Sequence, residues 1–243
     1  MEFLVVIPAR LKSTRLPEKP LVNLCGQSMI ERTYRQCLKA LPEDQVVVAT
    51  DHPKIFDHCE ERGMRVLMTP EKCLTGTDRV AAVAKEMDAS FYVNVQGDEP
   101  LFNPEDITRT VEAARNHPGE VINGFAPISD EHSYRSTSVP KVVLRPDGRL
   151  LYMSRSPIPG HKQNEFYRAW RQICVYAFPK TALMDFASRN QKTPLESMED
   201  IEILRFLEMG YEVRMIELSQ DSIAVDTPED VERVIAEIKR REQ

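Results

Sequence analysis

Four basic side chains stand close together near the start of the chain, at Arg10, Lys12, Arg15 and Lys19. They follow an apolar run at residues 3–7, which is typical of a buried strand. In an open α/β sheet, ligands bind beyond the carboxyl ends of the strands, where this basic segment begins. Arginine and lysine side chains there would neutralise a polyanion such as a triphosphate. The segment therefore predicts a phosphate-binding loop, although it has neither the P-loop nor the dinucleotide-binding glycine pattern.

Two aspartates stand at the ends of predicted strands. Asp98 follows the apolar run at residues 91–95, and Asp226 ends the run at residues 222–226. Hard cations such as Mg²⁺ take carboxylate and phosphate oxygens as ligands. Each aspartate alone is as typical of a turn or a helix cap as of a metal ligand. Together with the basic loop, the two carboxylates indicate a nucleotide–metal site.

Two glycine-containing turns accompany these residues. Residues 75–79, Thr-Gly-Thr-Asp-Arg, lead into a predicted helix and offer hydroxyls and backbone amides to a base or a phosphate. Gly97 lets the backbone before Asp98 turn close to a ligand. Both turns would lie at the same edge of the sheet as the basic loop.

These motifs need a framework that brings strand ends together. The first half of the chain alternates short apolar runs with helical patterns, which predicts a parallel sheet with crossover helices. We expect strands at residues 3–7, 46–49, 65–68, 91–95 and 121–125, and helices at about 28–41, 53–62, 78–87 and 104–116.

The pattern changes from about residue 126. The turn Pro146-Asp147-Gly148 lies between apolar runs at 142–144 and 150–153 and predicts a hairpin. Residues 160–170 read as a polar loop. We further expect strands at 173–178, 212–218 and 222–226, helices at about 180–189 and 196–209, and a last helix capped by Thr227 and begun by Pro228.

The predicted fold class is α/β. Residues 1–243 would form a single domain with a Rossmann-like, mostly parallel sheet flanked by helices. A smaller antiparallel insert at about 125–178 would carry apolar strands that need a covering surface. We therefore expect a homodimer through this insert.

Composition excludes several classes of protein. The net charge of -6 argues against a general nucleic-acid binder, which needs a basic face. No apolar run approaches the roughly 20 residues that span a bilayer, so we expect no membrane insertion. The five cysteines form no CxxC motif and indicate reduced thiols rather than a zinc site. The first residues lack the pattern of a signal peptide, and we expect a cytoplasmic protein.

The motifs resemble those of the CMP-sugar synthetases, specifically the 3-deoxy-manno-octulosonate (KDO) cytidylyltransferases. The resemblance covers nearly the whole chain. Six segments carry it in order: Pro8-Ala9-Arg10 through Lys19-Pro20-Leu21, Ala49-Thr50-Asp51, Gly76-Thr77-Asp78-Arg79, Val95-Gln96-Gly97-Asp98-Glu99-Pro100, Ser154-Arg155-Ser156-Pro157-Ile158-Pro159 and Val225-Asp226-Thr227-Pro228-Glu229-Asp230. A lone Gly-Asp-x-Pro would not be specific, but the ordered set is.

The resemblance implies a fold of the nucleotide-diphospho-sugar transferase type and an enzyme that depends on Mg²⁺. It implies transfer of CMP from CTP to the anomeric hydroxyl of a 3-deoxy-2-keto sugar acid, in the first place KDO. Pyrophosphate would be released, and the product would serve lipopolysaccharide or capsule synthesis.

The resemblance also assigns residues. The family pattern makes Arg10, Lys19 and Asp98 catalytic and Asp98 and Asp226 the Mg²⁺ ligands. It places a larger set around the nucleotide: Ala9, Arg10, Ser13, Arg15, Lys19, Thr75, Arg79 and Gln96. Arg155 matches a basic residue that faces the acceptor sugar.

Two positions depart from the family pattern. Gln172 stands where the octulosonate enzymes usually carry a histidine, and Ile203 stands where they usually carry a glutamine. By the family pattern both positions contact the acceptor, and a site built for one hydroxyl discriminates strongly against its loss. The acceptor-binding candidates are therefore Arg155, Gln172, Tyr176, Glu199, Glu202 and Ile203.

Several interpretations stay open at this point. The departures fit either a different 8- or 9-carbon sugar acid or a divergent KDO enzyme that recruits Glu199, Glu202 or Gln172. Cytidylyl transfer to a sugar or alditol phosphate is a further alternative, but it would favour an additional basic residue near Asp226. A non-catalytic nucleotide sensor is the third. Glu18, where glycine is common, is expected to point to the surface.

Overall fold

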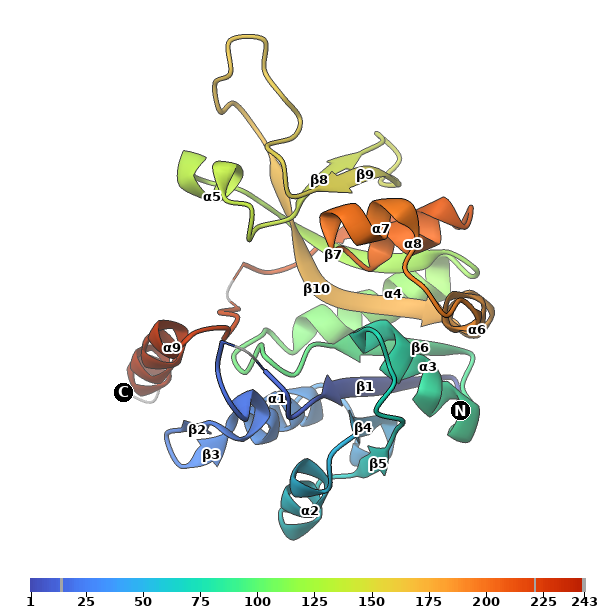
Figure 1. The fold of residues 1–243 in the computed structure, drawn as a ribbon, viewed down its shortest axis with the longest axis vertical. Helices are drawn as coiled ribbons and strands as arrows, with labels where there is room; N and C mark the ends of the chain where they lie inside the picture. The colour runs from blue at the N-terminus through green and yellow to red at the C-terminus, as the bar shows by residue number, and fades with distance from the viewer. Residues whose placement is uncertain (14, 221, 242–243) are drawn as a thin grey trace. The chain divides into compact units, whose positions relative to one another are not determined.

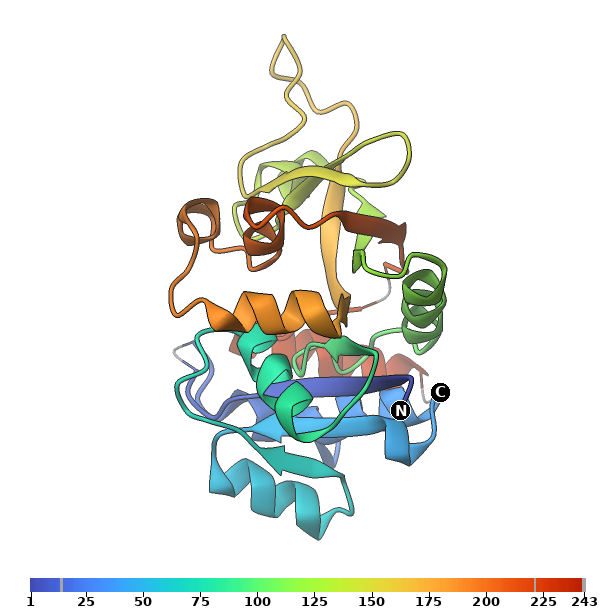
Figure 2. The ribbon, with the colours of Figure 1, turned by 90° about the vertical axis from the view of Figure 1, so that its right-hand side faces the viewer.

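The computed structural model describes residues 1–13, 15–220 and 222–241 (Figures 1 and 2). The chain forms two compact units. The first unit combines Met1–Thr108 with Ser219–Gln243, and the second unit is Arg109–Leu218. Within the described residues, no helix combines the length and the apolar character needed to cross a membrane.

A parallel sheet forms the centre of the first unit. β1 (Phe3–Ala9) pairs in parallel with β4 (Val46–Thr50) on one side and with β6 (Phe91–Val95) on the other, and β4 pairs with β5 (Val66–Met68). Every residue of β4 and β6 is buried. Continuous burial is expected where both faces of a parallel sheet are covered, so these strands read as unbroken apolar runs. The four predicted strands are confirmed.

Helices follow the strands of the first unit as predicted. Their bounds are α1 Met29–Leu38, α2 Pro53–Glu61, α3 Gly76–Glu86 and α9 Pro228–Arg241, with short 3₁₀ turns η1 Lys19–Leu21 and η2 Glu43–Gln45 and a small hairpin of β2 Asn23–Leu24 and β3 Gln27–Ser28. α4 (Glu105–Asn116) runs from the first unit into the second.

Helix α3 begins two residues earlier than the sequence pattern predicted. Thr75 and Asp78 form a capping box, in which the Asp78 N–H donates to Thr75 Oγ1 at 3.2 Å and the Thr75 N–H donates to Asp78 Oδ2 at 3.0 Å. Such a box satisfies two backbone donors that a helix start leaves unpaired. The helix therefore starts directly at the glycine turn.

The second unit contains a mixed sheet. Its strands are β7 Val121–Pro127, β8 Lys141–Leu144, β9 Leu150–Ser154, β10 Trp170–Pro179 and β11 Val213–Glu217, and its helices are α5 Glu131–Arg135, α6 Lys180–Ser188, α7 Pro194–Glu199 and α8 Ile203–Glu208. β7 pairs in parallel with β11 and antiparallel with β10, while β8 pairs antiparallel with β9 and β10. The predicted hairpin is confirmed. Figures 1 and 2 both show the segment before β10 as a long loop that reaches away from β8 and β9.

Strand β10 contains a bulge that a buried asparagine stabilises. The register with β7 shifts between Ile173 and Tyr176. Asn123, fully buried in β7, donates its amide to the carbonyls of Ile173 at 2.9 Å and Val175 at 3.0 Å. The bulge leaves these carbonyls without a regular ladder partner, and the asparagine supplies the missing donors.

The predicted strand at 222–226 is wrong. Those residues have no strand structure, and residue 221 lies outside the described part of the chain. Ile223 and Val225 pack into a cluster with Leu24 and Val234 of α9, so their alternating apolar pattern reflects packing in a loop. The Val225 N–H donates to the carbonyl of Asp98 at 2.9 Å.

The predicted single helix at 196–209 is also wrong, because it is two short helices. Asp200 follows α7 with a φ of 52°, a left-handed conformation that ends a helix. α8 then begins at Ile203. The break carries Glu199 and Asp200 at a helix end rather than on a helix face.

Replacing Gly97 with alanine tests how closely the loops of the first unit approach. A Cβ there would lie 3.0 Å from the Pro8 carbonyl oxygen and 3.3 Å from Ile30 Cδ1. We expect Gly97→Ala to lower the free energy of unfolding by about 1–3 kcal/mol in urea titrations, since the backbone must shift. In the control Gly160→Ala, the added Cβ meets no heavy atom within 4 Å. Equal stability of the two variants would contradict the close approach.

Candidate active site

Three loops of the first unit meet where the sequence predicted. A Cβ built on Gly76 would lie 3.6 Å from both the Gln96 side-chain nitrogen and Pro8 Cγ. A Cβ on Gly97 would lie 3.0 Å from the Pro8 carbonyl oxygen. The end of β1, the end of β6 and the start of α3 are therefore neighbours.

Lys19 joins the two predicted metal ligands. Its Nζ donates to Asp98 Oδ2 at 2.7 Å and to Asp226 Oδ1 at 3.0 Å. Arg15 Nη2 lies 3.0 Å from the same Asp226 oxygen. The Lys19 side chain is 17% exposed, whereas that of Arg15 is 63% exposed. The structure thus brings four sequence-predicted residues into one cluster of two cations and two carboxylates.

The surroundings of Lys19 favour its charged form. Burial lowers the pKa of the Lys19 ammonium. The adjacent carboxylates of Asp98 and Asp226 raise it by more than burial lowers it, so the pKa lies above the ordinary value of 10.5. An opposite charge within a few ångströms stabilises the ionised form of a group. Lys19 therefore stays a cation at neutral pH.

The backbone around Asp226 is held by hydrogen bonds. Asp230, in the first turn of α9, accepts the N–H groups of Asp226 at 3.1 Å and Thr227 at 3.0 Å. The expected N-cap is confirmed, because Thr227 Oγ1 accepts the Asp230 N–H at 3.4 Å. Burial raises the pKa of Asp230, but the N–H donors of Asp226 and Thr227 lower it more, so that it lies below its usual value. Asp226 is thus fixed by a helix start.

Other predicted nucleotide-side residues lie at the end of β1, in the loop after it or at the start of α3. Ala9 is buried at the end of β1, and Arg10 is exposed in the loop that follows. Ser13 Oγ accepts the Leu16 N–H at 3.4 Å. Thr75 caps α3, as described above.

Arg79 acts inside the first unit rather than at an exposed surface. It is 4% exposed, and it donates to Asp51 Oδ2 at 2.7 Å and to Thr69 Oγ1 at 2.6 Å. These partners follow β4 and β5 directly. Arg79 therefore fixes the carboxyl ends of two strands next to the site.

Glu18 points to the surface, as expected. It adopts a left-handed φ of 52°, which explains why glycine suits this position. Both of its carboxylate oxygens accept from Lys54 Nζ at 2.6 Å, and the two side chains are about half exposed. The negative charge of Glu18 is thus matched by a lysine of α2.

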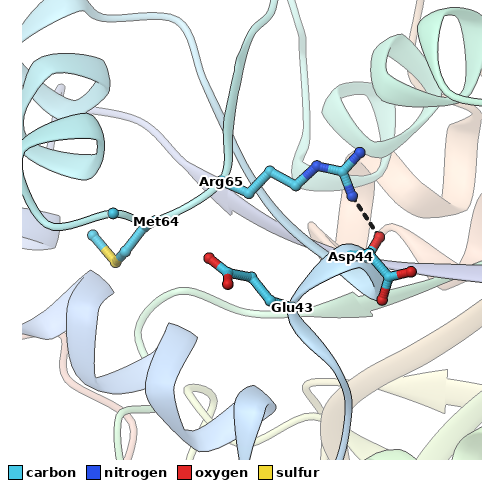
Figure 3. A pocket seen from close by; sticks show the side chains of 5 residues that line it. Glu43, Asp44, Met64 and Arg65 are labelled. Carbon is cyan, nitrogen blue, oxygen red and sulfur yellow. Dashed lines mark hydrogen bonds between the residues drawn. The ribbon is translucent and has the colours of Figure 1, made fainter.

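A surface hollow of the first unit lies away from these loops. It is lined by Glu43, Asp44, Gly63, Met64 and Arg65 (Figure 3). Arg65 donates to the backbone carbonyl of Asp44 (Figure 3). The lining residues precede β4 and β5, whereas Asp98 follows β6. The hollow and the cluster therefore lie at opposite ends of the parallel strands.

In the second unit, the predicted acceptor residues Arg155 and Glu199 contact each other. Arg155 donates to the carbonyls of Glu199 at 2.5 Å, Asp200 at 2.9 Å and Thr137 at 3.0 Å. These bonds engage three of the five guanidinium N–H groups. The Glu199 carboxylate accepts from Ser154 Oγ at 2.6 Å and from the Arg155 N–H at 2.8 Å. The pair fixes the turn between α7 and α8.

A buried lysine that sequence reasoning missed supports Arg155. Lys141 Nζ is fully buried and donates to the carbonyls of Ser136 at 2.8 Å, Val139 at 2.7 Å and Arg155 at 2.5 Å. Burial lowers the pKa of Lys141 below its ordinary value. A single lysine in a short strand pattern gives no signal of this role.

Helices α7 and α8 are joined by a second missed pair. Arg205 and Glu196 are fully buried and form two hydrogen bonds of 2.6 Å. The Arg205 guanidinium lies 3.7 Å from the ring centre of Phe186. Breaking such a buried pair leaves an uncompensated charge, which is costly. The pair therefore holds α7, the helix that ends in Glu199, against α8.

Three of the remaining acceptor candidates are buried, and the fourth is half-buried. Gln172 donates its amide to Asn123 at 3.0 Å and to the hydroxyl of Tyr176 at 3.2 Å, and both Gln172 and Tyr176 are 8% exposed. Ile203 is 1% exposed, and Glu202 is half-buried. Contact of these residues with a sugar stays a prediction.

Comparison with known proteins identifies the family. A family model described as cytidylyltransferase matches residues 4–218. The chain belongs to the cytidylyltransferase family. The predicted family resemblance and fold class are thereby confirmed.

Two relatives are similar over nearly their whole length, and both are named 3-deoxy-manno-octulosonate cytidylyltransferase. The protein of Protochlamydia amoebophila is 38% identical, with 96% of this chain and 93% of that one covered. The protein of Chloroherpeton thalassium is 39% identical, with 99% of each chain covered. The similarity therefore extends over nearly the whole chain.

A solved structure of CMP:2-keto-3-deoxy-manno-octonic acid synthetase complexed with CTP matches with a TM-score of 0.92 at 32% identity, covering 99% of this chain and 100% of that one. The structure of HddC from Yersinia pseudotuberculosis matches with a TM-score of 0.69 at 16% identity, covering 98% and 100%. The second likeness concerns the fold alone.

The donor set of this cytidylyltransferase suits one kind of metal. Among the described residues, no group of three or more His, Cys, Asp or Glu side chains is placed to hold an ion. Asp98 and Asp226 offer two sets of hard carboxylate oxygens. Mg²⁺ is typically bound through one or two carboxylates, with phosphates and water completing its shell. The residues present therefore fit a magnesium ion that arrives with a nucleotide.

Glu199→Gln tests the hydrogen bonds that the Glu199 carboxylate accepts in the second unit of the cytidylyltransferase. Burial raises the pKa of Glu199, but donation by Ser154, the Arg155 N–H and Tyr152 lowers it more, to below its usual value. Because an amide accepts fewer hydrogen bonds, we expect a loss of about 1–3 kcal/mol in unfolding free energy at pH 7.

The pH dependence of the unfolding free energy gives a second test of these hydrogen bonds. Since the folded pKa lies below the unfolded one, the stabilisation exists above the unfolded value and is lost as pH falls through the folded value. The difference in unfolding free energy between wild type and Glu199→Gln should therefore shrink as the pH falls through the folded pKa. Glu217→Gln, at an exposed position of β11, is the control. A difference in unfolding free energy that does not depend on pH would contradict hydrogen bonding to an ionised Glu199 carboxylate.

Proposed function

We propose that this chain transfers CMP from CTP to the anomeric hydroxyl of KDO and releases pyrophosphate. One observation supports this most strongly. Lys19, Asp98 and Asp226 meet at the strand ends of a cytidylyltransferase whose relatives are named for this reaction. The CMP-sugar would serve lipopolysaccharide or capsule synthesis.

The basic loop would bind the triphosphate of CTP. Arg10, Arg15 and Lys19 would neutralise the phosphates, with Ser13 beside them. As the acceptor oxygen bonds to the α-phosphorus, the bond to the leaving pyrophosphate breaks and the hydroxyl proton passes to water. Cations placed at the leaving group stabilise the charge that develops there.

The cytidine would lie against the neighbouring loops. Ala9, Thr75 and Gln96 would line this place, and the position of Gln96 beside Gly76 supports this. Arg79 would support it indirectly by fixing the ends of β4 and β5. A pocket held by strand ends is more rigid than one built on free loops.

Asp98 and Asp226 would hold Mg²⁺ during turnover. Bound there, Mg²⁺ would offset the repulsion between two anionic substrates and lower the pKa of the acceptor hydroxyl. Backbone hydrogen bonds hold the chain at Asp98 and at Asp226, so both residues are in place before substrate binds. Orientation of this kind reduces the entropy that the reaction must lose.

Arg155 would bind the acceptor carboxylate. Three of its N–H groups fix the guanidinium on protein carbonyls, and the other two suit a carboxylate. A related 8- or 9-carbon sugar acid is the second candidate acceptor. It is favoured by Gln172 and Ile203, because Ile203 is buried and the Gln172 amide donates within the protein.

Pyrophosphate release tests the proposed reaction. With CTP and Mg²⁺, we expect release that depends on KDO, measured beside a panel of related sugar acids and phosphorylated sugars. Release with another sugar acid only would replace KDO as the acceptor. Release with a phosphorylated sugar only, or with no acceptor at all despite CTP binding, would contradict the proposal.

The variant Asp98→Asn tests the metal assignment. We expect turnover to fall roughly 100-fold or more, because several kcal/mol of charge stabilisation depend on the metal. Asp44→Asn, at the exposed opposite end of the sheet, should keep the wild-type rate. A wild-type rate for Asp98→Asn at saturating Mg²⁺ would refute the assignment.

We also propose that the protein is a homodimer through residues 125–178. Two large side chains of this segment, Leu151 at 56% exposed and Tyr167 at 86% exposed, are available to a partner. Light scattering at micromolar concentration should give twice the chain mass, and Leu151→Glu should shift the protein toward monomer. Leu74→Glu, at an exposed position of the first unit, is the control. A monomeric wild type would overturn this proposal.

A further inference from the structure

The Lys19 ammonium occupies the place between the two carboxylates that a metal ion would share. It contacts Asp98 Oδ2 at 2.7 Å and Asp226 Oδ1 at 3.0 Å. Both oxygens are natural ligands for a hard cation. A metal ion that uses them must compete with an ammonium group that is already bound.

The charge balance of the cluster opposes a free metal ion. Arg15 and Lys19 carry two positive charges, and Asp98 and Asp226 carry two negative ones, so the cluster is neutral. A dication added alone would face two neighbouring cations in a partly enclosed site, where repulsion is stronger than in water. A triphosphate adds several negative charges and removes that cost.

The two cations of the cluster are not equivalent. The Arg15 side chain is 63% exposed and contacts Asp226 alone of the pair, so it can turn into solvent. The Lys19 side chain is 17% exposed and contacts both carboxylates. Lys19 is therefore the group that a metal ion must displace.

We infer that Lys19 makes this site select a metal ion that is bound to nucleotide over a free metal ion. The ammonium holds the carboxylate pair until a triphosphate offers it a stronger partner, and the carboxylates are then open to the metal. This inference rests on the proposed role of Asp98 and Asp226 as metal ligands. It adds that Lys19 sets the specificity for the metal–nucleotide complex.

The test measures Mn²⁺ binding to the protein without nucleotide, by calorimetry and by the electron paramagnetic resonance of free Mn²⁺. We expect Lys19→Met to bind Mn²⁺ at least about tenfold more tightly than wild type, since a charge in contact with both ligands is removed. Lys12→Met removes the same charge from an exposed position of the same loop and should change the affinity less than about twofold.

The result that would overturn the inference is equal Mn²⁺ affinity of Lys19→Met and wild type. Equal tightening by Lys12→Met would also overturn it, because the effect would then be one of net charge. Lys19→Gln provides a second variant if Lys19→Met does not fold. No Mn²⁺ binding to either folded Lys19 variant would count against the inference as well.

A separate arm distinguishes failure of the inference from failure of the proposed function. Mn²⁺ binding in the presence of CTP is compared between wild type and Asp98→Asn. If Asp98→Asn leaves this binding unchanged, the metal assignment itself is wrong. If the binding is lost but Lys19→Met shows no tightening without nucleotide, the assignment stands and the role of Lys19 is wrong.

Discussion

The ion pairs of Lys19 with Asp98 and Asp226 join three segments that are far apart in the chain. Lys19 and Asp226 are separated by 207 positions, yet their side chains lie 3.0 Å apart. The long separation makes this contact costly to form by itself, because closing a long loop loses entropy. It exists because packing elsewhere has already brought the segments together, and the site depends on that packing.

An apolar cluster supplies this packing in the first unit. Val234 and Ile238 of α9 pack with Leu24, Met29 and Val225, all of them buried. This contact returns the end of the chain to the first unit and places Asp226 beside the end of β6. The hydrogen bonds from Asp230 then orient the backbone of Asp226. Burial of apolar surface provides the free energy, and the polar contacts provide the geometry.

The second unit uses buried charges for the same purpose. Lys141 and Arg205 are both fully buried, and each donates hydrogen bonds that hold the backbone or the helix of a predicted acceptor residue. Lys141 holds the carbonyl of Arg155, and Arg205 holds Glu196 in the helix that ends in Glu199. Buried ionic groups are a poor source of stability but can specify one arrangement. We interpret these residues as supports of the acceptor side.

The strands that carry the nucleotide side were predictable because each is a short, mostly apolar run between helical patterns. The basic loop, Asp98 and Asp226 were predicted from residue type and position, and the resemblance added the roles of the other site residues. The structure shows which of these side chains contact one another. The strand predicted at 222–226 failed because Ile223 and Val225 alternate as strand residues do but pack in a loop. The helix predicted at 196–209 failed at Asp200, whose left-handed conformation has no strong local signal.

Long-range polar contacts were not predictable from local patterns. The Arg155 guanidinium binds backbone carbonyls, and a carbonyl is present at every position of the chain, so no residue type marks its partners. The same holds for Lys141. The short helix Glu131–Arg135 was missed as well, because it spans little more than one turn after its Asp130 cap.

A crystal structure of the protein with CTP and Mn²⁺ tests the role of Lys19 most directly. We expect an anomalous scattering peak in contact with carboxylate oxygens of both Asp98 and Asp226, with Lys19 Nζ moved from these oxygens to the phosphates of the nucleotide. A structure in which CTP is bound while Lys19 still bridges the two carboxylates, with Mn²⁺ elsewhere, would contradict that role.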